Sequence, residues 1–145
     1  MGIGDALARQ MVDFVRSLRL DVDMLIPIPL GKKRLKERGY NQVALVARPL
    51  ALELGLLYFP QGLRKSRETR SQVGLNISQR RDNVSKVYQA EVNFVNAKSV
   101  LLMDDVATTG STIQSAAEAL LSVGAREVYA LTIARALAHH DLNRV

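Results

Sequence analysis

The sequence contains no cysteine, and this absence excludes several kinds of chemistry. Without cysteine there is no disulfide scaffold, no thiolate nucleophile, and no cysteine-ligated zinc or iron–sulfur site. Histidine is scarce as well, because the only two, His139 and His140, lie side by side near the end of the chain. A chain of 145 residues can bury roughly two-thirds of its unfolded surface, so it needs no covalent or metal staple.

Long apolar runs and targeting signals are also absent. The longest apolar runs are only a few residues, such as 100–103, which is too short to cross a bilayer. The first residues lack the basic start and apolar stretch of a secretory signal peptide. There is no internal repeat and no low-complexity tract. These features predict one soluble, cytoplasmic domain over residues 1–145.

The positive charge of the chain is concentrated in its middle. The formal net charge is +6, and residues 32–86 alone carry thirteen basic and four acidic residues. Such an excess suits an anionic partner, either a phosphate-rich small molecule or nucleic acid. On composition alone, a solvated surface is the simpler explanation of the same charges.

Apolar strands alternate with amphipathic helices along the chain. The expected helices are a leading helix within residues 1–20 and helices over 41–54 and 111–123. Asn41 can cap the second helix, Gly55 ends it, and Pro49 predicts a kink or a break into two helices. The expected strands cover residues 22–27, 56–59, 84–90, 98–103 and 127–133.

Two segments do not fit this alternation. Residues 61–83 have no clean period and are rich in arginine, serine, glutamine and asparagine, so they are a candidate flexible loop. Residues 138–145 are expected to form a tail. The remaining strands lack polar alternation and are separated by helices. This pattern predicts an α/β fold, a three-layer α/β/α sandwich with a mainly parallel sheet of four or five strands.

The segment richest in candidate functional residues is 100–112, with the sequence VLLMDDVATTGST. A buried strand ends on Asp104 and Asp105, small hydroxyl residues surround Gly110, and a helix then begins. Ligands bind at the carboxyl ends of strands in such sheets, and a helix start with uncovered amides suits a phosphate. The carboxylates would accept hydrogen bonds from ribose hydroxyls or bind Mg²⁺. These residues predict a ribose-5-phosphate site. A plain helix cap with a solvated turn would account for only one of the hydroxyl groups.

The same segment matches, at every position, the phosphoribosyl-pyrophosphate (PRPP) signature of the type I phosphoribosyltransferases. Residues 23–30, Arg34, 38–42 and 64–83 further resemble the ComF/GntX-like branch, which is associated with competence and DNA utilisation. Members of that branch commonly carry a cysteine-rich zinc module ahead of this domain, and this cysteine-free chain lacks it. We expect either a shortened chain or a natural variant without the module.

The resemblance implies a role for each matching residue. Asp104 and Asp105 would be the catalytic pair, holding the ribose hydroxyls directly or through Mg²⁺. The 5-phosphate would bind the loop made of Thr108, Thr109, Gly110, Ser111 and Thr112. The pyrophosphate would bind after the first strand, at Pro27, Ile28, Pro29 and Arg38. The flexible loop would close over the reacting centre with Arg64, Lys65 and Arg67.

The implied activity is Mg²⁺-dependent transfer of a 5-phosphoribosyl group from PRPP to a nitrogenous acceptor, with release of pyrophosphate. Two alternatives stay open, a non-catalytic PRPP- or nucleotide-binding regulator and a competence protein acting in DNA uptake or utilisation. The implied partners are PRPP, an unidentified acceptor, competence or DNA-processing proteins, and a second copy in a homodimer. Nucleic acid has weaker support, because no aromatic residues are interleaved with the arginines between Phe59 and Tyr88.

Overall fold

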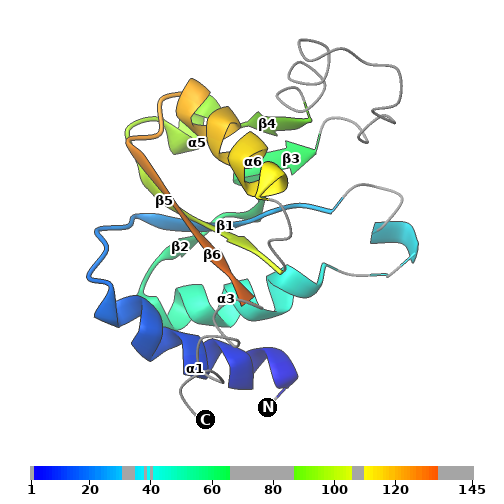
Figure 1. Cartoon of the computed structure of the whole chain (residues 1–145), viewed down its shortest axis with the longest axis vertical. Helices are drawn as coiled ribbons and strands as arrows, with labels where there is room; N and C mark the ends of the chain where they lie inside the picture. The colour runs from blue at the N-terminus through cyan, green and yellow to red at the C-terminus, as the bar shows by residue number, and fades with distance from the viewer. Residues whose placement is uncertain are drawn as a thin grey trace.

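A parallel sheet forms the centre of the fold. The computed structural model describes residues 2–30, 35–37, 39, 41–65, 87–105 and 110–133 (Figure 1). In these residues four strands pair in the order β2-β1-β5-β6, and every neighbouring pair is parallel. They are β1 (Met24–Pro27), β2 (Leu57–Tyr58), β5 (Ser99–Asp104) and β6 (Glu127–Thr132). The predicted α/β class with a mainly parallel sheet is confirmed.

Helices cover both faces of this sheet. Helices α1 (Ile3–Ser17) and α3 (Gln42–Leu54) lie on one face, and α6 (Ser111–Ser122) lies on the other (Figure 1). The side chains of Leu101 and Met103 in β5 pack against α1 and α3. Those of Val100 and Leu102 pack against α6. Successive residues of a strand point to opposite faces of the sheet, and in β5 the residues on both faces are buried. This burial on both sides explains why the sequence of β5 before Asp104 is mostly apolar.

A small antiparallel sheet lies beside α6 on the second face. It pairs β3 (Leu63–Lys65), which follows the 3₁₀ turn η1 (Pro60–Gly62), with β4 (Tyr88–Ala90), and the short helix α5 (Val92–Val95) follows. The segment expected as a loop from residue 61 therefore starts with a turn and a strand. Residues 66–86, which hold the rest of that segment, lie outside the described residues.

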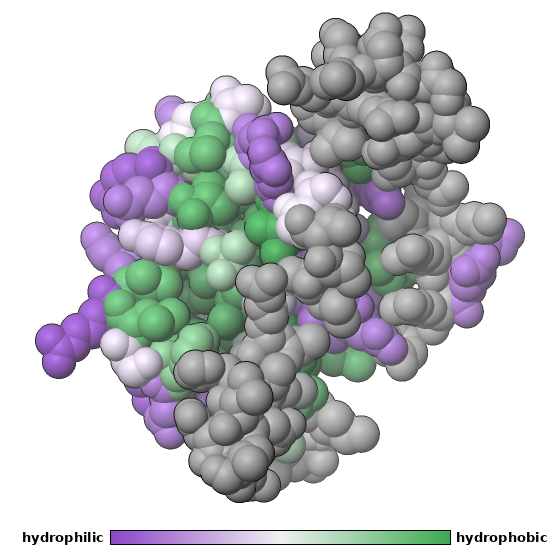
Figure 2. All heavy atoms as spheres, in the orientation of Figure 1, coloured by the Kyte–Doolittle hydropathy of each residue, from purple (hydrophilic) through white to green (hydrophobic). Residues whose placement is uncertain are grey.

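Some apolar side chains reach the surface. Figure 2 shows hydrophobic residues in the centre of this face of the molecule, with hydrophilic residues beside them. Leu121 of α6 is half exposed, and so are Val92 and Phe94 of α5. In the part of the chain that the structure describes, no helix has the length and apolarity needed to span a bilayer.

The connections after β1 and β5 leave the sheet in opposite directions. The chain passes from β1 to α3 on one face, and from β5 to α6 on the other. Since β1 and β5 are neighbours, the strand order reverses between them. In open α/β sheets, ligands bind outside the carboxyl ends of the strands at such a reversal. The fold thus points to the loops after Pro27 and Asp104.

Hydrogen bonds lock the opposite, amino edge of the sheet. The Asp23 carboxylate accepts a hydrogen bond from the backbone N–H of Ser99 at 2.8 Å. The buried Ser99 hydroxyl accepts bonds from Arg126 Nε at 3.1 Å and Nη2 at 2.8 Å. Arg126 Nη2 also lies 3.4 Å from the Asp21 carboxylate. These contacts fix the starts of three adjacent strands relative to one another.

Helix α3 runs through Pro49 without a break, contrary to the break that Pro49 predicts. Proline supplies no N–H, so the carbonyl of Leu45 loses its usual helical donor. Helix α1 packs closely at this point, because Gly4 lies so near Leu45 that a Cβ at Gly4 would collide with its carbonyl oxygen. Contact with a neighbouring helix thus accompanies the one position where α3 departs from regular hydrogen bonding.

We expect Gly4→Ala to lower the free energy of unfolding by about 1–3 kcal/mol through this collision. Helix propensity alone predicts the opposite sign, a gain of about 1 kcal/mol, because glycine is a poor helix former. Urea denaturation of both proteins at 25 °C measures the difference. Equal or greater stability of the variant would mean that α1 does not pack this tightly on Leu45.

Candidate functional site

Two carboxylates stand at the carboxyl end of β5, at the reversal point of the sheet. Asp104 is the last residue of the strand and Asp105 follows it, and both are half-buried. The Asp104 Oδ1 atom accepts a hydrogen bond from the backbone N–H of Asp105 at 2.8 Å. Both acids lie at the carboxyl end of a buried strand, which is the position that the sequence predicts for them.

Burial changes the acidity of Asp104. Desolvation raises its pKa from 3.8 to about 6, the hydrogen bond from the Asp105 N–H opposes the rise, and the negative charge of Asp105 adds to it. A carboxylate held in this way carries a charge that the fold itself does not neutralise. A cationic or hydrogen-bond-donating ligand would stabilise the ionised form.

Helix α6 begins directly beyond these acids. Its N-cap, Gly110, has a φ of +78°, a left-handed conformation that favours glycine. A Cβ at Gly110 would meet nothing within 4 Å, so the backbone here faces open space. Ser111 and Thr112 start the helix with exposed side chains. The first amides of a helix have no acceptor within the helix and carry partial positive charge, which suits a phosphate.

The loop that follows β1 lies at the same carboxyl edge of the sheet as Asp104, because β1 is the neighbour of β5. The N–H of Ile28 bonds to the carbonyl of Met103 at 2.8 Å, which extends the β1–β5 pairing into the loop. Asn41, the N-cap of α3, then joins this loop to its helix. Its Oδ1 accepts from the Val43 N–H at 3.1 Å, and its Nδ2 donates to the Ile28 carbonyl at 3.3 Å.

Asn41 makes one contact at this edge that the sequence did not predict. The sequence indicates its role as a cap, and the structure confirms that role. The second bond, to Ile28, joins residues 13 positions apart and leaves no local pattern in the sequence. The only hint in the sequence is that Asn41 follows the loop that contains Pro27 and Pro29.

The other predicted residues fall into three groups. Pro27 ends β1, and Ile28 and Pro29 follow it at the reversal point. Four positions, Arg38, Arg67, Thr108 and Thr109, lie outside the described residues. Arg64 and Lys65, assigned to the flexible loop, belong instead to β3.

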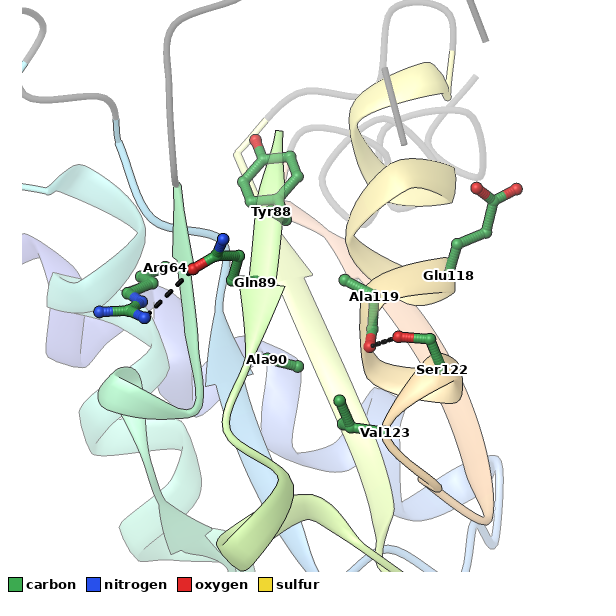
Figure 3. Close-up of a pocket in the computed structure, with 8 residues that line it drawn as sticks. All are labelled: Arg64, Tyr88, Gln89, Ala90, Glu118, Ala119, Ser122 and Val123. Carbon is green, nitrogen blue, oxygen red and sulfur yellow. Dashed lines mark hydrogen bonds between the residues drawn. The ribbon is translucent and has the colours of Figure 1, made fainter. Parts of the chain in front are cut away.

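Arg64 lines a separate cavity of about 450 Å³ between the small sheet and the second half of α6 (Figure 3). Its guanidinium donates to Gln89 Oε1 at 3.1 Å, across the strand pair. Glu118 and Ser122 belong to the opposite wall. Glu118 is about 10 Å along α6 from Ser111 at 1.5 Å per residue. The structure therefore does not bring Arg64 to the start of α6.

The two carboxylates of Asp104 and Asp105 suit a metal ion whose other ligands come from a bound substrate and water. Within the described ranges, no cluster of three or more histidine, cysteine, aspartate or glutamate side chains could hold a metal ion. Mg²⁺ is commonly bound by one or two carboxylates plus substrate phosphates and water. Asp104 and Asp105 fit that mode of binding.

Comparison with known proteins identifies the family. Residues 41–143 match the phosphoribosyl transferase domain family. The chain belongs to that family. The predicted likeness to the ComF-like branch is also confirmed, since the curated relatives are DNA utilization and competence proteins.

Two relatives illustrate the match. The chain is 34% identical over 140 residues to the DNA utilization protein YhgH of Salmonella typhimurium, which covers 93% of this chain and 61% of the relative. It is 33% identical over 116 residues to competence protein F of Haemophilus influenzae, which covers 79% of this chain and 51% of the relative. The chain thus spans about half to three-fifths of the length of these relatives.

A solved structure supports the fold. The glutamine PRPP amidotransferase from B. subtilis, complexed with ADP and GMP, matches with a TM-score of 0.63 and 20% identity. The match covers 90% of this chain and 26% of that one. The predicted type I phosphoribosyltransferase-like fold is confirmed.

The raised pKa of Asp104 predicts a pH-dependent cost to stability. In the unfolded chain Asp104 ionises near 3.8, but in the folded protein it ionises near 6. The folded state therefore holds the proton more tightly, and stability falls as pH rises from about 4 to above 6. Asp104→Asn removes this loss and is expected to raise stability at pH 7.5 by about 1 kcal/mol, allowing for solvent screening of a half-exposed group.

Thermal denaturation of both proteins between pH 4 and pH 8 measures this effect. The difference in melting temperature should be small at pH 4 and grow toward pH 7. Asp105→Asn should give a smaller gain over the same pH range, because the charge of Asp105 contributes to the raised pKa of Asp104. Asp13→Asn, at an exposed position of α1, is the matched control. A variant that is less stable than wild type at pH 7.5 would contradict the assignment.

Variants of Asn41 separate its two hydrogen bonds. Asn41→Asp keeps the acceptor for the Val43 N–H but cannot donate to Ile28, so it should preserve the cap and release the loop. Asn41→Ala loses both bonds and should cost about 1–2 kcal/mol. Chemical denaturation measures the stabilities, and amide exchange of Ile28 reports on the loop. Equal exchange at Ile28 in wild type and Asn41→Asp would refute the tethering role.

Proposed function

We propose that this chain binds PRPP with Mg²⁺ and transfers its 5-phosphoribosyl group to a nitrogenous acceptor, releasing pyrophosphate. The observation that carries the proposal is the placement of Asp104 and Asp105 directly before the Gly110 start of α6, at the reversal point of the sheet. This order along the chain supports a site in which the carboxylates would bind the ribose and the first amides of α6 would bind the phosphate. Membership of the phosphoribosyl transferase domain family supports the same assignment.

Three sets of residues would bind the three parts of PRPP, namely the 5-phosphate, the ribose and the pyrophosphate. The 5-phosphate would lie on the loop 108–112 and the start of α6, where amides and helix dipole favour an anion. The ribose hydroxyls would donate to Asp104 and Asp105. The pyrophosphate would lie near residues 27–30, with Arg38 as a cationic partner. Burial disfavours the ionised form of Asp104 and raises its pKa to about 6, so a ligand that donates hydrogen bonds or brings positive charge would favour ionisation.

The reaction forms a bond from the acceptor nitrogen to the anomeric carbon and breaks the bond from that carbon to pyrophosphate. Pyrophosphate leaves with the bonding electron pair, and the acceptor loses a proton to solvent or to a basic group. Positive charge develops on the ribose, so ionised Asp104 and Asp105 would stabilise the transition state electrostatically. Bound Mg²⁺ would supply charge neutralisation for the pyrophosphate oxygens.

A second candidate function is DNA handling in competence or DNA utilisation. The names of the relatives favour it, as does the basic excess of residues 32–86. Such binding would rest on backbone phosphates and fall steeply with salt. DNA affinity that is retained after loss of Asp104 and Asp105 would indicate this function, independent of the PRPP site.

A thermal-shift titration tests the PRPP site. With PRPP and Mg²⁺ at about 100 times Kd, ligand binding should stabilise the protein by roughly 2.7 kcal/mol, a shift of several degrees. Asp104→Asn combined with Asp105→Asn should abolish the shift while the ligand-free protein stays folded. Asp13→Asn combined with Glu53→Gln is the control, because it makes the same charge change at exposed positions of α1 and α3.

Two results of this titration would contradict the proposed PRPP site. One is an absence of any shift in the wild-type protein, and the other is an equal shift in the Asp104/Asp105 double variant. Once binding is established, pyrophosphate release with a panel of purine, pyrimidine and amine acceptors separates an enzyme from a non-catalytic PRPP-binding regulator.

A further inference from the structure

Thr132 carries an unpaired polar group in the interior. It is the last residue of β6 and is only 6% exposed. Its Oγ1 is buried and has no hydrogen-bond partner, alone in this among the side chains that the structure describes. Leaving a buried hydroxyl unpaired costs free energy, so such groups in proteins call for an explanation.

The register of the sheet places Thr132 beside the candidate site. In the parallel pairing of β5 with β6, Thr132 is the partner of Asp104. Side chains at paired positions of neighbouring strands point to the same face, and the strands lie about 4.8 Å apart. Val100 and Leu102, four and two residues before Asp104, pack on the α6 side. Asp104 and Thr132 therefore share the α6 face at the carboxyl edge.

Thr132 has unused hydrogen-bonding capacity, and Asp104 is an acceptor. The Oδ1 atom of Asp104 accepts from the N–H of Asp105, the Asp104 carboxylate also interacts with the Asp105 side chain, and each carboxylate oxygen can accept more than one hydrogen bond. The Thr132 hydroxyl has a donor proton with no acceptor. A rotation of the Asp104 side chain is enough to change which groups its oxygens meet.

We propose that Thr132 is a positioning residue for Asp104, and that its hydroxyl donates a hydrogen bond to the Asp104 carboxylate when PRPP and Mg²⁺ occupy the site. The inference rests on the proposed function. In the ligand-free protein the hydroxyl is unpaired. In the complex it holds the carboxylate in the orientation that accepts the ribose hydroxyls, so the cost of the unpaired group is recovered only with ligand bound.

Thr132→Val tests the inference, because valine has the shape of threonine without the hydroxyl. The ligand-free variant should melt at or above the wild-type temperature, since no hydrogen bond is lost. Its Kd for PRPP in the presence of Mg²⁺ should rise about tenfold, the value of one hydrogen bond to a charged group. Thr132→Ser restores the hydroxyl and should restore most of the affinity.

Ser99→Ala is the matched control. Ser99 is a buried hydroxyl residue of β5 at the opposite edge of the sheet, and its hydroxyl accepts two bonds from Arg126. Its loss should lower the melting temperature and leave the Kd for PRPP unchanged. The two variants are therefore expected to give opposite patterns in stability and affinity.

A double-mutant cycle shows whether Thr132 acts through Asp104. In an Asp104→Asn background, Thr132→Val should cause little further loss of affinity, because the two residues work as a unit. Full additivity of the two losses would overturn the positioning role. Unchanged affinity of Thr132→Val, or a lower melting temperature without ligand, would overturn it as well.

These outcomes are distinct from failure of the proposed function. If wild-type protein shows no response to PRPP with Mg²⁺, the proposed function falls and the positioning role falls with it. If wild type responds and Thr132→Val responds equally, only the role of Thr132 is refuted.

Discussion

The parallel pairing of β1 with β5 is the constraint on which the candidate site depends. The chain leaves these two strands toward opposite faces, so the strand order reverses between them, where ligands bind in open α/β sheets. The bond from Ile28 N–H to the Met103 carbonyl continues the pairing beyond the strand. At the far, amino edge of the sheet, the hydrogen bonds of Ser99 join the starts of the strands.

The site is assembled from groups that work against the stability of the fold. Among the described residues, Asp104 is desolvated beside a second carboxylate, and Thr132 has a buried hydroxyl without an acceptor. Both are unfavourable in the free protein. Polar groups of this kind, gathered at one edge of an otherwise apolar sheet, are typical of a region kept for a ligand rather than for packing.

Much of this architecture could be predicted from the sequence, because the strong signals are local. The apolar run before Asp104, the cap at Asn41 and the left-handed Gly55 each depend on a few neighbouring residues, and the structure agrees with them. The strand β3 could not be predicted in this way, since its partner β4 lies more than twenty residues further on. The close contact of α3 with Gly4 beside Pro49 is likewise not recorded in sequence periodicity. The half-burial of Asp104, the last residue of β5, also has no local signal in the sequence.

The register of the small sheet has a consequence for how the chain can vary. Lys65 is paired with Tyr88, so residues 66–87 leave and rejoin the fold at nearly the same point. The free energy of closing a loop rises slowly with its length, by about 0.6 kcal/mol for each doubling. A change in chain length between residues 66 and 86 would therefore cost little loop-closure free energy, whereas Val87 is only 4% exposed and packs in the core. The pairing of Lys65 with Tyr88 fixes both ends of that stretch, so the number of residues between them can change without moving the strands that flank it.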